Sequence, residues 1–202
     1  MLKKTVFLRI LTMLILTVVI LQTTLLAAEC REVKDKVVRL HILAQSDSAK
    51  DQLVKLRVRD ALLTRADFTG LKGTDPDTAV KTLRRQLPAL QKTAEAELKK
   101  LQVPQTVTCR IAPAQFPTRC YDGVTLPAGE YTALQVILGE GKGHNWWCVM
   151  FPPLCLAAAA DREELLTATL SPGGCHLVGS GDITVKFKAV ELVESVIGRL
   201  KG

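Results

Sequence analysis

Hydrophobic residues are concentrated at the N-terminus, where residues 10–21 form a run of twelve without a charge. Two lysines and an arginine precede this run, and apolar residues continue to Ala28 after a short polar interruption. A basic head before a short apolar core is typical of export signals, and a spanning helix needs about 20 apolar residues. Residues 1–28 therefore predict a cleaved signal peptide or a retained N-terminal membrane anchor rather than a buried core helix.

The charge around this segment predicts its orientation. The excess of Lys and Arg on its N-terminal side favours a cytoplasmic N-terminus, with the rest of the chain on the far side of the membrane. A lipoprotein signal is disfavoured because Glu29 stands where a small residue should precede Cys30. We therefore expect residues 29–202 to form a single extracytoplasmic domain.

The first part of this domain alternates between strand and helix patterns. Apolar and β-branched residues over 37–43 predict a strand. Three residues suited to an N-cap, at 46–48, precede an amphipathic pattern that predicts a helix over 48–65. After a loop with Gly and Pro, Asp77 is expected to cap a helical stretch to about Leu101, with a kink or break at Pro88.

The second part is richer in strand patterns. We expect strands over 106–111, 116–121, 130–138 and 145–151, with turns at 122–123 and 126–129 and a glycine-rich loop at 139–143. Residues 156–183 are expected to be irregular, with a short helix over 161–170 and a mobile glycine-rich segment after it. A C-terminal helix is expected over 184–202. Helices early and antiparallel strands late predict an α+β class.

Charge narrows the range of partners only slightly. The formal net charge is +7, and removing Lys3, Lys4 and Arg9 of the export segment leaves 7 − 3 = +4. The remaining basic pairs lie on helical patterns beside acidic residues, as on ordinary solvated helix faces. Nucleic acid is therefore not an expected partner.

The motif search predicts no enzyme. The 139–143 loop lacks the phosphate-loop spacing, and no helix pattern follows it. Cys148 would need His144 or His41 as a base, and residues four apart on a strand lie about 13 Å apart. No protease or esterase motif is present, and three histidines leave little for a metal site. We therefore expect no catalytic residue, no metal, no cofactor and no small-molecule substrate.

Six cysteines allow disulfides in an exported protein. Cys109 and Cys120 flank a predicted hairpin, and Cys148 and Cys155 flank a pair of prolines. Neither pair has the spacing of a zinc ribbon or a thioredoxin motif. These two pairs are the disulfide candidates.

The two tryptophans are adjacent, at Trp146 and Trp147, within a predicted strand. Side chains of neighbouring strand residues point to opposite faces, so one indole can enter the core while the other meets a second layer, a loop or solvent. An accessible Trp beside Tyr and Arg is also the composition of a binding hot spot.

Two groups of motifs resemble the stage II sporulation protein R family. The first is RLHILAQSDS at 39–48, with DQ at 51–52 and KLRVRDA at 55–61. The second is FPTR at 116–119, LPAGEY at 126–131 and GEGKGHNWWCVMFPPLC at 139–155. The resemblance covers about residues 36–155, and Gln45 departs from the Asn expected there.

The resemblance implies a function that composition does not. Members of this family are made in the forespore and exported into the space between forespore and mother cell. There they activate a membrane-embedded aspartic protease of the mother cell, which cleaves the precursor of a sigma factor. The chain is thus expected to be a signal, secreted or anchored through residues 5–28.

The composition of the motif suggests where the receptor binds. We expect contacts from the glycine-rich loop and the aromatic and basic residues near it: Asn145, Trp146, Trp147, Arg119, Tyr121 and Lys142. Two alternatives stay open at this point. One is an exported thiol enzyme that uses Cys148 and Cys155, and the other is a structural protein of the envelope.

Overall fold

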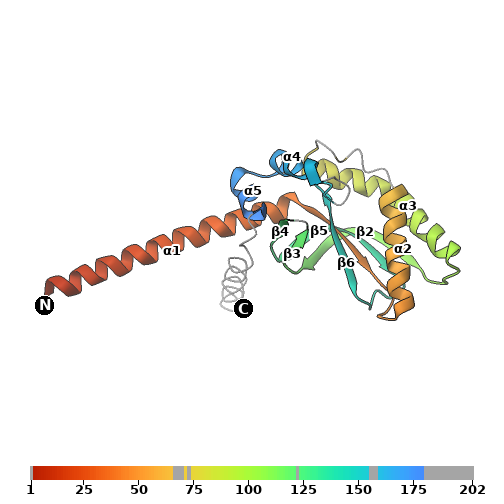
Figure 1. The fold of residues 1–202 in the computed structure, drawn as a ribbon, viewed down its shortest axis with the longest axis horizontal. Helices are drawn as coiled ribbons and strands as arrows, with labels where there is room; N and C mark the ends of the chain where they lie inside the picture. The colour runs from red at the N-terminus through yellow and green to blue at the C-terminus, as the bar shows by residue number, and fades with distance from the viewer. Residues whose placement is uncertain (1, 66–70, 72–73, 122, 155–158, 180–202) are drawn as a thin grey trace.

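The computed structural model describes residues 2–65, 71, 74–121, 123–154 and 159–179. Its helices are α1 (Leu2–Lys36), α2 (Ala49–Arg65), α3 (Pro76–Lys100), α4 (Ala159–Thr169) and α5 (Pro172–Gly179). Its strands are β1 (Val38–Leu43), β2 (Val107–Phe116), β3 (Arg119–Tyr121), β4 (Val124–Leu126), β5 (Gly129–Leu138) and β6 (Asn145–Phe151). The described chain is α+β, which confirms the predicted class (Figure 1).

Four strands form one sheet in the order β2-β5-β1-β6, and β3 pairs with β4 as a separate two-stranded ribbon. β2 and β6 are antiparallel to their neighbours, whereas β1 and β5 are parallel. The late strands were expected to form an antiparallel sheet, and β2 and β5 do pair in this way, whereas the early strand β1 joins the same sheet parallel to β5. The chain can make this parallel pair because α2, α3 and β2 lie between the two strands in sequence and supply the long return connection.

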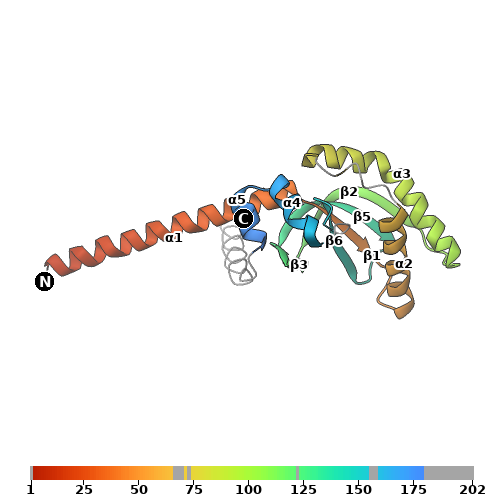
Figure 2. The same ribbon diagram turned by 45° about the horizontal axis from the view of Figure 1, so that its top comes forward.

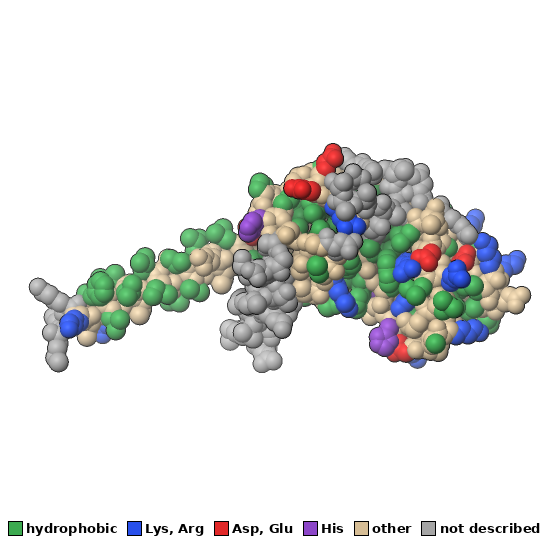
Figure 3. Space-filling view, in the orientation of Figure 1, with side chains coloured by type: hydrophobic (Ala, Val, Ile, Leu, Met, Phe, Trp, Pro, Cys, Tyr) green, Lys and Arg blue, Asp and Glu red, His purple; other side chains and the backbone are tan. Residues whose placement is uncertain are grey.

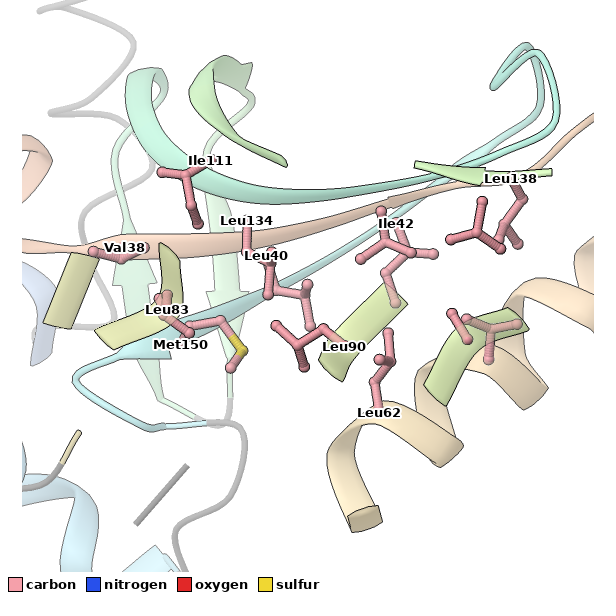
Figure 4. Close-up of a cluster of buried hydrophobic side chains, with 14 of the residues drawn as sticks. Val38, Leu40, Ile42, Leu62, Leu83, Leu90, Ile111, Leu134, Leu138 and Met150 are labelled. Carbon is pink, nitrogen blue, oxygen red and sulfur yellow. The ribbon is translucent and has the colours of Figure 1, made fainter. Parts of the chain in front are cut away.

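Helices α2 and α3 cover one face of the sheet (Figures 1 and 2). Alternate strand residues on this face meet leucines of both helices in a buried cluster (Figure 4). Its labelled members include Leu40 and Ile42 of β1, Leu134 of β5, Leu62 of α2 and Leu90 of α3. Burying one such side chain contributes about 1.5–3 kcal/mol, so this cluster supplies much of the stability of the domain.

A second buried cluster lies on the opposite face. It joins the C-terminal end of α1 to β3, β4, α4 and α5 through apolar residues such as Val33, Leu126 and Leu177. Tyr131 and Val149 are among the sheet residues that this layer covers. Beyond this layer, Thr108, Arg110 and Asn145 on the same face of the sheet are exposed.

Helix α1 runs without a break from the apolar N-terminal segment into the domain. Residues 4–36 are long and apolar enough to cross a membrane by length and composition, with a mean hydropathy of 2.3 over the best window. Hydrophobic side chains are spread along the visible face of the protruding part (Figure 3). Burial begins near its end, where Cys30 and Val33 enter the second cluster.

Helix α3 differs from its prediction at its N-cap and at Pro88. Its N-cap is Asp75 rather than Asp77, because the Asp75 carboxylate accepts a 2.9 Å hydrogen bond from the backbone N–H of Thr78 and Pro76 begins the helix. Pro88 lies inside the continuous helix, which bends between its two halves (Figures 1 and 2). The predicted kink is therefore present, while a break is wrong.

Two strand predictions also need correction. Residues 106–111 and 116–121 were expected to be separate strands, but β2 extends through Pro113 to Phe116. Proline lacks a backbone N–H. It is tolerated in β2 because this is an edge strand, where no neighbouring strand accepts a hydrogen bond on the outer side. Only the short β3 remains of the second strand. The strands predicted over 130–138 and 145–151 are confirmed within one residue.

The region after β6 is more ordered than predicted. Helix α4 confirms the short helix expected over 161–170. Helix α5 occupies much of the segment that was expected to be irregular and glycine-rich, because the Glu32 carboxylate accepts hydrogen bonds from the backbone and hydroxyl of Ser171 just before it. The helix predicted over 184–202 lies outside the described residues.

Candidate functional site

The adjacent tryptophans lie on opposite faces of the sheet, as the strand pattern predicts. Trp146 packs against the cluster beneath α2 and α3, and the guanidinium of Arg59 on α2 lies 5.2 Å from the centroid of its ring. Trp147 packs against the second cluster on the other face. The two indoles therefore cannot belong to one continuous contact surface.

Strand pairing places two rows of residues on the same face of the sheet as Trp147. In one row across the sheet, Arg110 on β2 pairs with Gln135 on β5, Gln135 with His41 on β1, and His41 with Trp147 on β6. The next row, towards the β5–β6 loop, is Thr108, Ile137, Leu43 and Asn145. We call these two rows, together with Arg119 above them, the open sheet face.

Arg119 joins this face from the β3–β4 ribbon. Its guanidinium lies 4.5 Å from the centroid of the Trp147 ring, within the range of a cation–π contact. Arg119 is exposed, whereas Trp147 is half-buried. Of the residues predicted to bind a partner, Arg119, Trp147 and Asn145 are therefore brought together.

Tyr121 has a different role, next to a buried arginine. Arg39 is 0% exposed, and its guanidinium lies 4.2 Å from the Phe116 ring, 5.0 Å from the Tyr131 ring and 5.3 Å from the Tyr121 ring. Nη2 donates a 2.5 Å hydrogen bond to the hydroxyl of Tyr121. Burial lowers the pKa of Arg39 and raises that of Tyr121. Tyr121 therefore links the β3–β4 ribbon to β1 of the sheet through Arg39.

His41 is the titratable group of the open sheet face. Its Nε2 lies 2.9 Å from the side-chain oxygen of Asn145, while its buried Nδ1 has no hydrogen-bond partner. Burial lowers the pKa of His41, the positive charge of Arg39 lowers it further, and the Asn145 contact raises it. His41 is therefore held in its neutral form and orients Asn145.

The β5–β6 loop is fixed to the start of α2. The Asp47 carboxylate accepts a 2.5 Å hydrogen bond from the backbone N–H of His144 and also contacts that imidazole. Lys55, only 5% exposed, donates to the His144 carbonyl at 2.9 Å. Lys142 is exposed and paired with Glu140 at 2.6 Å. The structure thus places Lys142 on the loop, apart from the row that contains Trp147.

One of the two predicted cysteine pairs is contradicted by the structure. Cys109 and Cys120 are both free, which contradicts a disulfide between them. Cys109 lies on β2 with its pKa raised to about 12 by burial, whereas Cys120 is exposed on β3. Cys148 is not among the free thiols. Its predicted partner Cys155 lies outside the described residues, so that pairing stays a prediction.

The thiol-enzyme alternative loses its histidine partners. Cys148 pairs with Leu40 on β1 and contacts the helix-side cluster, whereas His41 belongs to the other face. The Nδ1 atom of His144 faces Asp47 instead. Within the described residues, no group of three or more His, Cys, Asp or Glu side chains is placed to hold a metal ion.

Sequence reasoning missed the three residues that share the row of Trp147: His41, Arg110 and Gln135. His41 was considered only as a base for Cys148, and Arg110 and Gln135 carried no motif. Arg110 donates from Nε to the Gln135 side chain at 2.8 Å. The alternation of β2 places Arg110 on one face, but only the pairing with distant β5 and β1 shows which residues it joins.

Taken together, the fold defines an α+β domain joined directly to an apolar helix that could span a membrane. Residues 34–161 match the model of the family described as stage II sporulation protein R (spore_II_R), and the chain belongs to this family. It is therefore a sporulation protein.

One curated relative matches closely. The chain is 37% identical over 134 residues to stage II sporulation protein R of Bacillus subtilis (strain 168). The match covers 66% of this chain and 59% of the relative, so it spans less than two thirds of that protein's length. No solved structure matches the chain.

Proposed function

We propose that this protein is an exported signal that activates a membrane-embedded aspartic protease of the mother cell during sporulation. The activated protease then cleaves a sigma-factor precursor. The chain itself acts as the activator and performs no catalysis. Family membership over residues 34–161 carries this proposal, and the resemblance of the sequence motifs to this family implies the activity.

The N-terminal helix supports the exported location. Its apolar part is unburied, and it directly precedes the region that matches the family. In this proposal residues 5–28 carry the domain across the forespore membrane into the space between the two cells. A cleaved form diffuses to its receptor, whereas an anchored form meets the receptor across facing membranes.

The geometry refines the expected contact residues. Asn145, Trp147 and Arg119 share the open sheet face, with Tyr121 supporting it. We propose that these residues contact the receptor. Trp146 acts instead in the packing of α2 on the sheet, and Lys142 contributes at the margin, from the β5–β6 loop.

Co-expression tests the activity directly. The full chain, the candidate protease and a tagged sigma precursor are produced in a host that does not sporulate, and the processed band is sought. The control is the same host with a protease whose catalytic Asp is replaced by Asn. We expect a processed band only with the intact pair, and its absence would remove the proposed activity.

A second experiment separates signalling from an envelope role. The chain without residues 1–28 is supplied from outside to cells that display the protease. Processing under these conditions supports a diffusible signal. The buried part of α1 begins close to this cut, so the truncation spares Cys30 and Val33 in the second cluster.

A further inference from the structure

We propose that the open sheet face binds an acidic, extended segment of the receptor protease. This inference rests on the proposed function and adds the chemistry of the contact. It is carried by the charges on the face, by the spacing of its arginines and by the unpartnered polar atoms beneath it.

The face is basic and carries no carboxylate. Among the residues that β1, β2, β5 and β6 pair on this side, all of them described, none is Asp or Glu. Arg110 and Arg119 are exposed here, and neither forms an ion pair with a residue that the structure describes. On the helix side, by contrast, Arg59 is paired with Asp60 at 2.6 Å. A partner that complements the charge of the open sheet face is therefore acidic.

The spacing of the arginines selects an extended ligand. Arg110 and Trp147 lie at the two ends of a row that crosses all four strands. With about 4.8 Å between neighbouring strands, the ends are about 14 Å apart. Arg119 stacks over the Trp147 end. About five residues of extended chain span this distance and can place carboxylates at both ends of the row.

The half of the row that holds His41 and Trp147 has unused hydrogen-bonding capacity. Nδ1 of His41 and Nε1 of Trp147 are buried and have no hydrogen-bond partner. Buried polar atoms without partners cost stability, so a ligand that moves Arg119 aside and offers an oxygen to the indole regains that energy. An arginine stacked on a half-buried Trp is also the composition of interface hot spots.

A lipid surface is the competing anionic partner, and the face is poorly suited to it. Proteins that lie on membranes insert exposed large apolar side chains between the lipids. Beyond α1, the exposed large hydrophobic side chain in the described chain is Leu53 on α2, on the helix side. The open sheet face thus offers charge without insertion anchors, which favours a protein segment.

The first arm of the test measures the chemistry of the face alone. The full chain in detergent micelles is titrated with fluorescent poly-L-glutamate, and binding is followed by anisotropy. Arg110→Glu/Arg119→Glu is compared with Arg57→Glu/Arg84→Glu, which makes the same charge change at exposed positions of α2 and α3. We expect binding at least about tenfold weaker for the face variant only. Equal losses in both variants would overturn the inference.

The second arm tests which surface of this chain contacts the protease. A photo-reactive p-benzoylphenylalanine replaces Asn145 on the face or, as the matched control, Arg57 on α2, in the co-expression host. Cross-links to the protease from position 145 and not from position 57 are expected. Cross-links from position 57 only, or from position 145 to lipid only, would contradict the inference.

The two arms keep the proposals distinguishable. If the first arm shows the expected contrast and the wild-type chain yields no processed sigma precursor, the proposed function fails while the acidic preference of the face stands. If processing occurs and neither arm singles out the face, the inference about the face fails while the signalling role stands.

Discussion

Trp146 and Trp147 are neighbours in the chain and have opposite structural environments: Trp146 packs under α2, and Trp147 packs beneath Arg119. Their substitutions should therefore separate stability from recognition. Trp146→Ala is expected to lower the free energy of unfolding by about 2–4 kcal/mol, because it leaves a cavity between α2 and β6.

Urea unfolding of the full chain in detergent measures this change. Leu53→Ala serves as the control, since Leu53 is exposed on α2, the helix that packs over Trp146. Equal midpoints for Trp146→Ala and Leu53→Ala would contradict the core role of Trp146.

The bond between Arg39 and Tyr121 gives a second prediction. Tyr121→Phe keeps the ring beside the guanidinium and removes the acceptor of the 2.5 Å hydrogen bond from Nη2. A charged donor left unpaired in a buried site costs about 1–3 kcal/mol, so the variant should unfold at lower urea. Thr118→Ser on the same connection is the control. Unchanged stability in Tyr121→Phe would show that the ring contacts alone hold Arg39.

Acidification should weaken the domain through His41. Burial lowers its pKa from 6.5, so the unfolded state binds a proton first as the pH falls. The stabilisation is complete above the unfolded pKa, and it is lost as the pH drops from about 6.5 through the folded-state pKa. His41→Gln should remove this dependence in denaturation curves between pH 7 and pH 5. A variant curve parallel to that of the wild type would rule out His41 as its source.

Thiol labelling checks the corrected disulfide. In the native chain without reductant, maleimide should label exposed Cys120 within minutes at pH 7.5 and leave Cys109 unmodified, because Cys109 is buried and its pKa is about 12. Mass spectrometry of the digested chain reads both sites. Protection of both cysteines, reversed together by reductant, would restore the predicted Cys109–Cys120 bond.

The β5–β6 loop depends on a glycine at position 143. Its N–H donates to the carbonyl of Ala44 at 2.9 Å, and an added Cβ would collide with the backbone of Ser46. Gly143→Ala should destabilise the domain by about 1–3 kcal/mol and move Asn145 at the start of β6. Lys142→Ala, at an exposed neighbour, is the matched control. Equal melting temperatures for the two variants would show that the loop adapts freely.

Local sequence patterns predicted the helices and strands themselves better than they predicted which of these elements pack together. The strand at 145–151 was placed correctly because two prolines follow it, and the opposite faces of Trp146 and Trp147 follow from strand periodicity. The cap of α3 was misplaced by two residues because Asp75 and Asp77 are both capable caps and only the bond to Thr78 decides between them.

In the candidate site, too, local patterns identified single residues but not which residues are neighbours in space. Arg119, Asn145 and Trp147 were expected from composition, whereas Arg110 and Gln135 became visible only through the register of β2 on β5. The parallel pairing of β1 and β5 joins segments about ninety residues apart in sequence, as His41 and Gln135 illustrate. No local pattern carries that register, because it is set by the packing of the whole sheet.

The unbroken course of α1 has a mechanical consequence. In an anchored molecule, no flexible tether separates the lipid from Cys30 and Val33 in the core, so the helix sets both the height and the heading of the domain above the bilayer. Each residue of α1 advances the chain by 1.5 Å and turns it by about 100°. The rotation of the anchor helix about its axis thus sets the direction in which Arg119 and Trp147 face relative to the bilayer.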